Sequence, residues 1–114
     1  MAAIIAVRCG NYLLYRDFII YDHSASRYFN FHLNENSDMN ISVYDYQKGN
    51  YIQGPLNSLY DYFSSSYMSL EIKGNTFQGY DYETSSFIAG NVDNLMICIY
   101  DYQTSSYYYY YMIK

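Results

Sequence analysis

The residues that could carry out acid–base, metal or nucleophilic chemistry in this sequence are few and scattered. His23 and His32 are its two histidines, and neither lies in an H-x-x-x-H or C-x-x-C spacing that marks a metal site. Serine is abundant, but no G-x-S-x-G nucleophile elbow occurs, and the serine clusters fall where turns are expected. Because no nucleophile, base and orienting group come together, we predict a protein that is not an enzyme and uses no metal or cofactor.

The two cysteines, Cys9 and Cys98, cannot make a disulfide framework. We expect them to be small buried hydrophobic side chains. A single Cys9–Cys98 bridge that joins the first and last strands stays open as the alternative.

Five aspartates form the one recurrent set of carboxylates: Asp22, Asp45, Asp61, Asp81 and Asp101. If the turns that carry them pointed the same way, the carboxylates would gather at one rim, and calcium binds several at once. Each aspartate, however, heads a four-residue turn in the same local context, where its side chain accepts hydrogen bonds from the N–H groups two and three residues on. We therefore expect these carboxylates to cap turns rather than to hold an ion.

The aspartates belong to an eight-residue repeat, Tyr-Asp-x-x-x-[Ser/Gly]-x-[Tyr/Phe], whose positions are numbered one to eight below. It occurs five times, as YDHSASRY (21–28), YDYQKGNY (44–51), YDYFSSSY (60–67), YDYETSSF (80–87) and YDYQTSSY (100–107). Position six must reverse the chain with positive φ, which suits Gly49 and which serine tolerates at some strain. The aromatic residues at positions one and eight should then face each other across a hairpin. Locally the segment resembles the second hairpin of the immunoglobulin-binding domain of protein G, which implies a turn geometry and no function.

Turn residues also separate the repeats, at Lys73-Gly74-Asn75, Val92-Asp93-Asn94 and residues 34–38. Pro55 marks residues 53–57 as a looser loop or a sheet edge. The apolar start of the chain reads as a first strand. These elements predict one all-β domain over residues 1–114, an antiparallel meander of about ten short strands.

Alternation along the strands predicts one apolar face, from Phe18 to Met112, and one wet face studded with aromatic pairs and small polar residues such as Ser42. A sheet of this size with one dry face must curl to cover it. We predict a closed barrel, because closure removes exposed strand edges, with a two-sheet β-sandwich as the alternative.

The most unusual feature of the composition is tyrosine, at 19 of 114 residues. Tyrosine with serine, glycine and asparagine is the composition that binding loops use. We therefore predict a non-enzymatic binding or assembly module that uses the Tyr/Ser-rich face for contact with protein or with itself. The alternative is a carbohydrate-binding module that stacks sugars on the aromatic pairs. The candidate binding residues are Tyr44, Tyr51, Tyr80, Phe87, Tyr100 and Tyr107.

Charge argues against two other classes of partner. The net charge is −5 and the six Lys and Arg residues are scattered, so we expect neither nucleic acid nor an anionic membrane surface to bind. No run approaches the ~18 apolar residues that a membrane helix needs, and the first residues lack a signal-peptide pattern. We expect a cytoplasmic protein, with secretion after signal removal left open.

Overall fold

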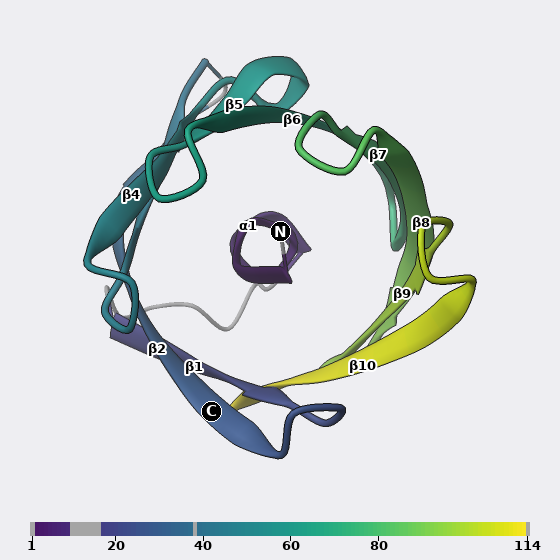
Figure 1. Cartoon of the computed structure of the whole chain (residues 1–114). Coiled ribbons are helices and arrows are strands. Elements are labelled where there is room, and N and C mark those ends of the chain that lie inside the picture. Colours follow the sequence, from purple (N-terminus) through teal and green to yellow (C-terminus); the bar gives the residue numbers. More distant parts are fainter. Residues whose placement is uncertain (1, 10–16, 38, 114) are drawn as a thin grey trace.

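In the computed structural model, which describes residues 2–9, 17–37 and 39–113, ten antiparallel strands close into a barrel around one helix (Figure 1). The elements are α1 (Ala2–Cys9), β1 (Asp17–Asp22), β2 (Arg27–Asn36), β3 (Ile41–Asp45), β4 (Asn50–Gly54), η1 (Leu56–Ser58), β5 (Leu59–Asp61), β6 (Ser66–Lys73), β7 (Thr76–Asp81), β8 (Ser86–Asp93), β9 (Met96–Asp101) and β10 (Ser106–Ile113). Each strand pairs with the next in sequence, and β10 pairs with β1 to close the barrel. The predicted meander and barrel are confirmed, and the sandwich alternative is wrong.

The five repeats form hairpins in the predicted register. Positions one and eight lie directly opposite each other, at Tyr21–Tyr28, Tyr44–Tyr51, Tyr60–Tyr67, Tyr80–Phe87 and Tyr100–Tyr107. Position six has positive φ, between 53° and 67°, at Ser26, Gly49, Ser65, Ser85 and Ser105. The repeat therefore encodes one turn geometry five times.

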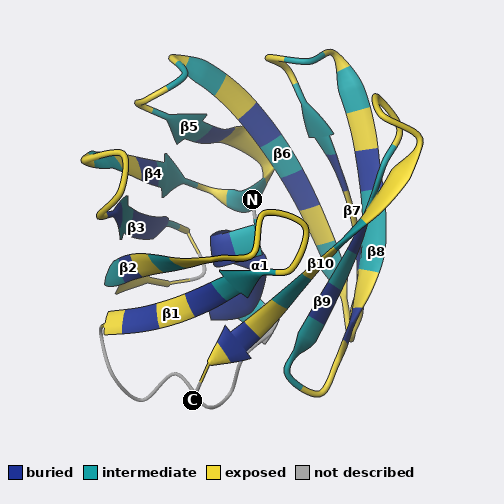
Figure 2. Ribbon diagram, turned by 60° about the horizontal axis from the view of Figure 1, so that its bottom comes forward, coloured by how far each residue is buried: buried dark blue, intermediate teal, exposed yellow. Residues whose placement is uncertain are grey.

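Side chains alternate between the barrel interior and its outside, which appears as successive bands of burial along the strands in Figure 2. Predicted core residues such as Ile20, Ile41 and Ile97 are buried as expected. Ser42 departs from the prediction, because it is buried although it lies on the outer face. Its hydroxyl donates to Oε1 of Gln53 on the neighbouring strand at 3.0 Å, so a longer polar side chain covers it.

The start of the chain is a helix, so the prediction of a first strand there is wrong. Helix α1 lies within the ring of strands, and Ala3 to Val7 are at most 5% exposed (Figure 1). A short apolar run does not distinguish a buried strand from a buried helix by periodicity, and alanine favours the helix. A ten-stranded barrel is also wider than the eight-stranded barrels that side chains can just fill. The side chains of α1 therefore fill the part of the interior that the strands alone would leave empty.

The loop around Pro55 loosens the barrel wall, as predicted. Strand β4 ends at Gly54, the short helix η1 follows, and β5 has only three residues. Two register pairs join β4 to β5, at Ile52–Asp61 and Gln53–Tyr60. Gly54 has a φ of +133°, and a Cβ there would lie 2.6 Å from the Ser58 carbonyl oxygen, so only glycine fits this bend.

Candidate binding surface

Each repeat aspartate caps its own turn. Oδ1 of Asp45 accepts from the N–H of Gln47 at 2.9 Å and of Lys48 at 3.2 Å. In the other four repeats the N–H two residues further on also donates to Oδ1 of the aspartate, at 2.9–3.0 Å, in Asp22, Asp61, Asp81 and Asp101. The predicted capping role is confirmed, and it follows from the short side chain of aspartate at the head of a turn.

The five turns are joined into a ring at one end of the barrel. The N–H of position three in each repeat donates to a carbonyl of the adjacent hairpin at 3.0–3.1 Å. These bonds run from Tyr46 to Asn30, Tyr62 to Tyr51, Tyr82 to Tyr67, Tyr102 to Phe87 and His23 to Tyr109. Since the last of these joins the first repeat to β10, the hydrogen bonds pass all the way around the rim.

Aromatic rings surround this rim on the outside. We call the side chains at positions one, three and eight the aromatic collar: Tyr21, His23, Tyr28, Tyr44, Tyr46, Tyr51, Tyr60, Tyr62, Tyr67, Tyr80, Tyr82, Phe87, Tyr100, Tyr102 and Tyr107. In each hairpin the ring at position one packs between the other two. Its centroid lies 4.8–4.9 Å from the ring at position eight. The collar is therefore five packed clusters rather than a set of independent side chains.

The rings at positions three and eight carry the exposed area of the collar. The position-three tyrosines, Tyr46, Tyr62, Tyr82 and Tyr102, are 48–59% exposed, and the position-eight rings are 41–63% exposed. The binding residues predicted from the sequence do not include the position-three tyrosines. The sequence carries a signal for them, because four of the five repeats read Tyr-Asp-Tyr. The turn folds each of these side chains back onto position one.

Inside the rim the environment is acidic. The repeat aspartates pair in register with inward-facing residues, for example Asp45 with Phe31 and Asp22 with Tyr110. A hollow of about 170 Å³ lies there, and its charged lining residues are Asp22, Asp45, Asp61 and one cation, Lys48, beside the first residues of α1. Negative charge at a helix N-terminus is favourable. Among the described residues, no three His, Cys, Asp or Glu side chains are placed to share a metal ion.

Tyr110 contributes a phenol to this interior. Burial, with the charge of nearby Asp22 as a smaller cause, raises the pKa of Tyr110 to about 12.

All five position-one tyrosines are half-buried, and register places a different side chain beside each of them on the outer face. The residue paired with each tyrosine on the adjacent strand is Tyr111 for Tyr21, His32 for Tyr44, Gln53 for Tyr60, Ser69 for Tyr80 and Ala89 for Tyr100. The paired side chain is thus large at three positions and small at two, at Tyr80 and Tyr100.

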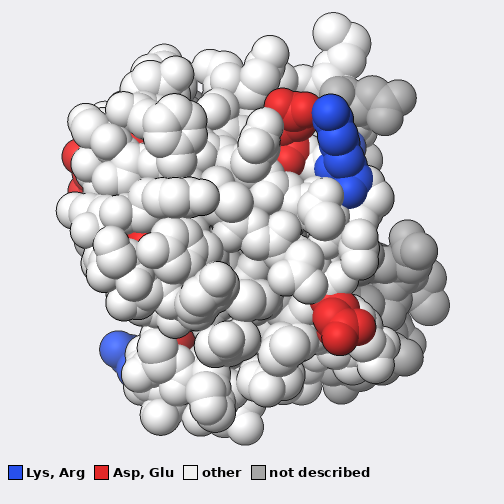
Figure 3. Space-filling view, turned by 90° about the vertical axis from the view of Figure 1, so that its right-hand side faces the viewer, with Lys and Arg blue, Asp and Glu red and all other residues white. Residues whose placement is uncertain are grey.

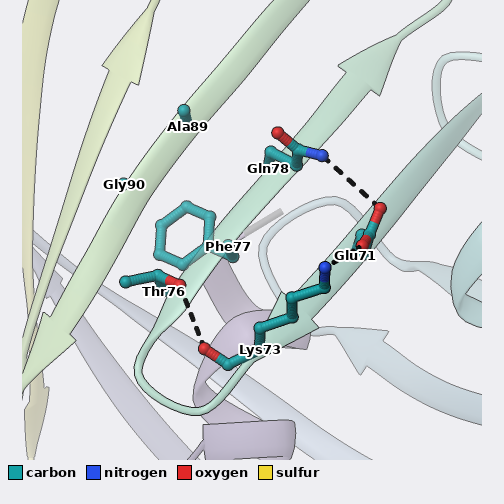
Figure 4. A pocket seen from close by; sticks show the side chains of 7 residues that line it. All are labelled: Glu71, Lys73, Thr76, Phe77, Gln78, Ala89 and Gly90. Atoms are coloured by element: carbon teal, nitrogen blue, oxygen red, sulfur yellow. Dashed lines mark hydrogen bonds and ion pairs between the residues drawn. The ribbon is translucent and has the colours of Figure 1, made fainter.

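The outer face is hollowed beside these two tyrosines. One hollow, of about 280 Å³, is lined by Asn57, Ser69, Leu70, Glu71, Gln78, Gly79, Tyr80 and Phe87. A wider one, of about 810 Å³, is lined by Ala89, Gly90, Asn91, Tyr100, Tyr102 and Tyr107. A third, of about 310 Å³, shares residues with both and is drawn in Figure 4. Four of the six predicted binding residues therefore line a hollow, while Tyr44 and Tyr51 belong to a hairpin whose first tyrosine is paired with His32.

The two histidines do not meet. His23 belongs to the collar, with its ring centroid 6.0 Å from that of Tyr111. His32 contacts Asp17, with Nδ1 and Oδ1 2.7 Å apart, and the Tyr46 hydroxyl donates to the same oxygen at 3.1 Å. The hydrogen bond with His32, followed by that with Tyr46, lowers the pKa of Asp17. This group fastens the start of β1 to the second hairpin.

Cys98 is a free thiol on the outer face, half-buried opposite Tyr109, so the bridge to Cys9 is not formed. The prediction of a buried hydrophobic residue holds only in part for Cys98. The side chain of Cys9 lies outside the described residues. The thiol also acts on its neighbour, since the proximity of Cys98 raises the pKa of Tyr109.

Within the described ranges, no helix has the length and apolar character to cross a membrane. Comparisons with protein-family models, with curated proteins and with solved structures found no match to this chain.

Proposed function

We propose that this chain is a non-enzymatic binding or assembly module that engages protein, either a partner or a second copy, through the aromatic collar. The observation that supports it is the exposure of the rings at positions three and eight while each is packed against position one. Rings held in this way give up little conformational entropy when a partner covers them. They also offer hydroxyl groups at the edge of each contact.

The charge of the rim affects which assemblies form. Five aspartates lie on the inner side of the rim, and two copies that met rim to rim would bring these carboxylates together. Self-association is therefore expected to use the outside of the collar, with barrels side by side. A protein partner could instead cover the rim if it brought basic groups.

The test replaces the four position-three tyrosines, Tyr46, Tyr62, Tyr82 and Tyr102, with serine. This change removes exposed rings and leaves the cross-strand pairs between positions one and eight intact. The matched control carries Glu83→Ser and Gln103→Ser, which are exposed turn residues next to position three. Light scattering on a sizing column measures self-association, and affinity capture measures partner binding.

The proposal expects an oligomer or a captured partner that is lost in the tyrosine variant and kept in the control. If the oligomeric state and the captured proteins are the same for wild type, variant and control, the collar is not a protein-binding surface.

A further inference from the structure

We call openings of the collar the two places, at Tyr80 and Tyr100, where the residue paired with a position-one tyrosine on the adjacent strand is small. Their paired residues on the adjacent strands are Ser69 and Ala89, where the equivalent residues of other repeats are His32, Gln53 and Tyr111. Each opening continues into a hollow on the outer face. The two openings therefore come from the sequence at one repeated position and not from the turn itself.

Polar side chains line these hollows beside the rings. Glu71 and Gln78 line both the first hollow and the third, which Figure 4 draws. The Glu71 carboxylate lies between Gln78 and Lys73, with Gln78 Nε2 3.4 Å from Oε2 and Lys73 Nζ 3.5 Å from Oε1. In the second, Asn91 is exposed, and within the described part of the chain its amide side chain makes no hydrogen bond. Each hollow thus combines an aromatic ring with amide or carboxylate groups that can still bond a ligand.

This combination selects a class of ligand. An apolar ligand would strip water from Glu71, Gln78 and Asn91 without replacing their hydrogen bonds. An anionic ligand would find one cation, Lys73, already beside Glu71. The surface seen in Figure 3 is also mostly uncharged. A neutral saccharide fits both the aromatic and the polar groups of the hollows. The C–H face of a pyranose packs on an aromatic ring, and its hydroxyls bond to amides and carboxylates.

We propose that the outer face of β6–β9 is a binding site for a neutral linear glycan, with one sugar subsite in the hollow lined by Tyr80 and Phe87 and a second in the hollow lined by Tyr100, Tyr102 and Tyr107. The two position-one tyrosines lie on β7 and β9, two strands apart, and their partners on β8, Phe87 and Ala89, are two residues apart, so the separation is roughly 12 Å. A chain of linked pyranose units running diagonally across the strands reaches both subsites. The site rests on the proposed recognition role of the outer face, and of the position-three tyrosines Tyr102 lines one of its hollows whereas Tyr46 and Tyr62 line neither.

The test screens the protein against a panel of linear neutral oligosaccharides of glucose, mannose, galactose, xylose and N-acetylglucosamine, and then measures affinity for the best binder by calorimetry. The decisive variant combines Ser69→Gln with Ala89→Gln, which places at both positions the residue type that is paired with Tyr60, Gln53. Both positions face outward, so the melting temperature should be unchanged. We expect affinity to fall by roughly tenfold or more as the two rings are covered.

Tyr100→Ala and Tyr44→Ala form a matched pair, because each removes a position-one ring from the same hairpin geometry. The first should lose glycan affinity and the second should keep it. The site is refuted if no oligosaccharide binds at millimolar concentration, or if the double glutamine variant binds as tightly as wild type. A variant that carries only Tyr46→Ser and Tyr62→Ser, at collar residues that line neither hollow, should still bind glycan while it weakens protein binding, so the two proposals fail separately.

Discussion

The backbone N–H of Tyr102 donates to the carbonyl oxygen of Phe87 at 3.1 Å, and this bond ties the turn of the last repeat to the hairpin before it. Tyr102 is also the ring that packs on Tyr100, with centroids 4.8 Å apart. One turn residue therefore fixes a neighbouring strand through its backbone and a binding surface through its side chain. Because the same bond recurs around the rim, a substitution that disrupts one turn should also destabilise the adjacent hairpin.

Loss of an aspartate cap should destabilise the barrel. Asp101→Ala removes the acceptor for the N–H of Gln103, which lies 2.9 Å from Oδ1, and we expect a cost of about 1 kcal/mol. Urea denaturation measures it. Asp101→Asn keeps an oxygen acceptor and should recover most of the loss. Asp93→Ala, at an exposed aspartate outside the repeat, is the control, and an equal effect there would contradict the capping account.

Glycine at position six of the repeat should stabilise the folded protein. Ser26 has a φ of +53°, a conformation that costs an L-residue about 1–2 kcal/mol, whereas glycine adopts it freely at a smaller entropic cost. Ser26→Gly should therefore stabilise the protein by about 0.5 kcal/mol. Ala25→Gly in the same turn, where φ is not positive, should destabilise it instead. Thermal melts of the two variants should move in opposite directions.

Helix α1 should be an integral part of the core. Ile5 is fully buried inside the barrel, and truncation to alanine should cost about 2–4 kcal/mol, since the surrounding wall cannot close over the cavity. Ile19→Ala, on the outer face at 37% exposure, removes the same atoms and should cost only about 0.5 kcal/mol. If Ile5→Ala and Ile19→Ala lose similar amounts of stability in chemical denaturation, the helix is not needed to fill the barrel.

The hairpins could be predicted from the sequence because their determinants are local. Asp at position two and Ser or Gly at position six fix the turn within eight residues, and alternation then fixes the faces. Helix α1 could not be predicted this way, because the width of the interior depends on strand number and closure. The small neighbours of Tyr80 and Tyr100 also depend on non-local pairing, since Ser69 and Ala89 come to lie beside them only when adjacent hairpins pair.

Alkaline pH should weaken the fold through Tyr110. Its pKa is raised from 10.0 to about 12 by burial and by Asp22, so the unfolded chain loses the proton at a lower pH than the folded chain does. The stability that this phenol contributes is therefore fully present below pH 10 and is lost as the pH rises toward 12. Tyr110→Phe cannot ionise, so urea midpoints measured at rising pH should fall less steeply than in wild type. Tyr107→Phe removes a phenol from the exposed collar and controls for the number of titrating groups. An unchanged pH slope in Tyr110→Phe would mean that the buried phenol does not couple ionisation to folding.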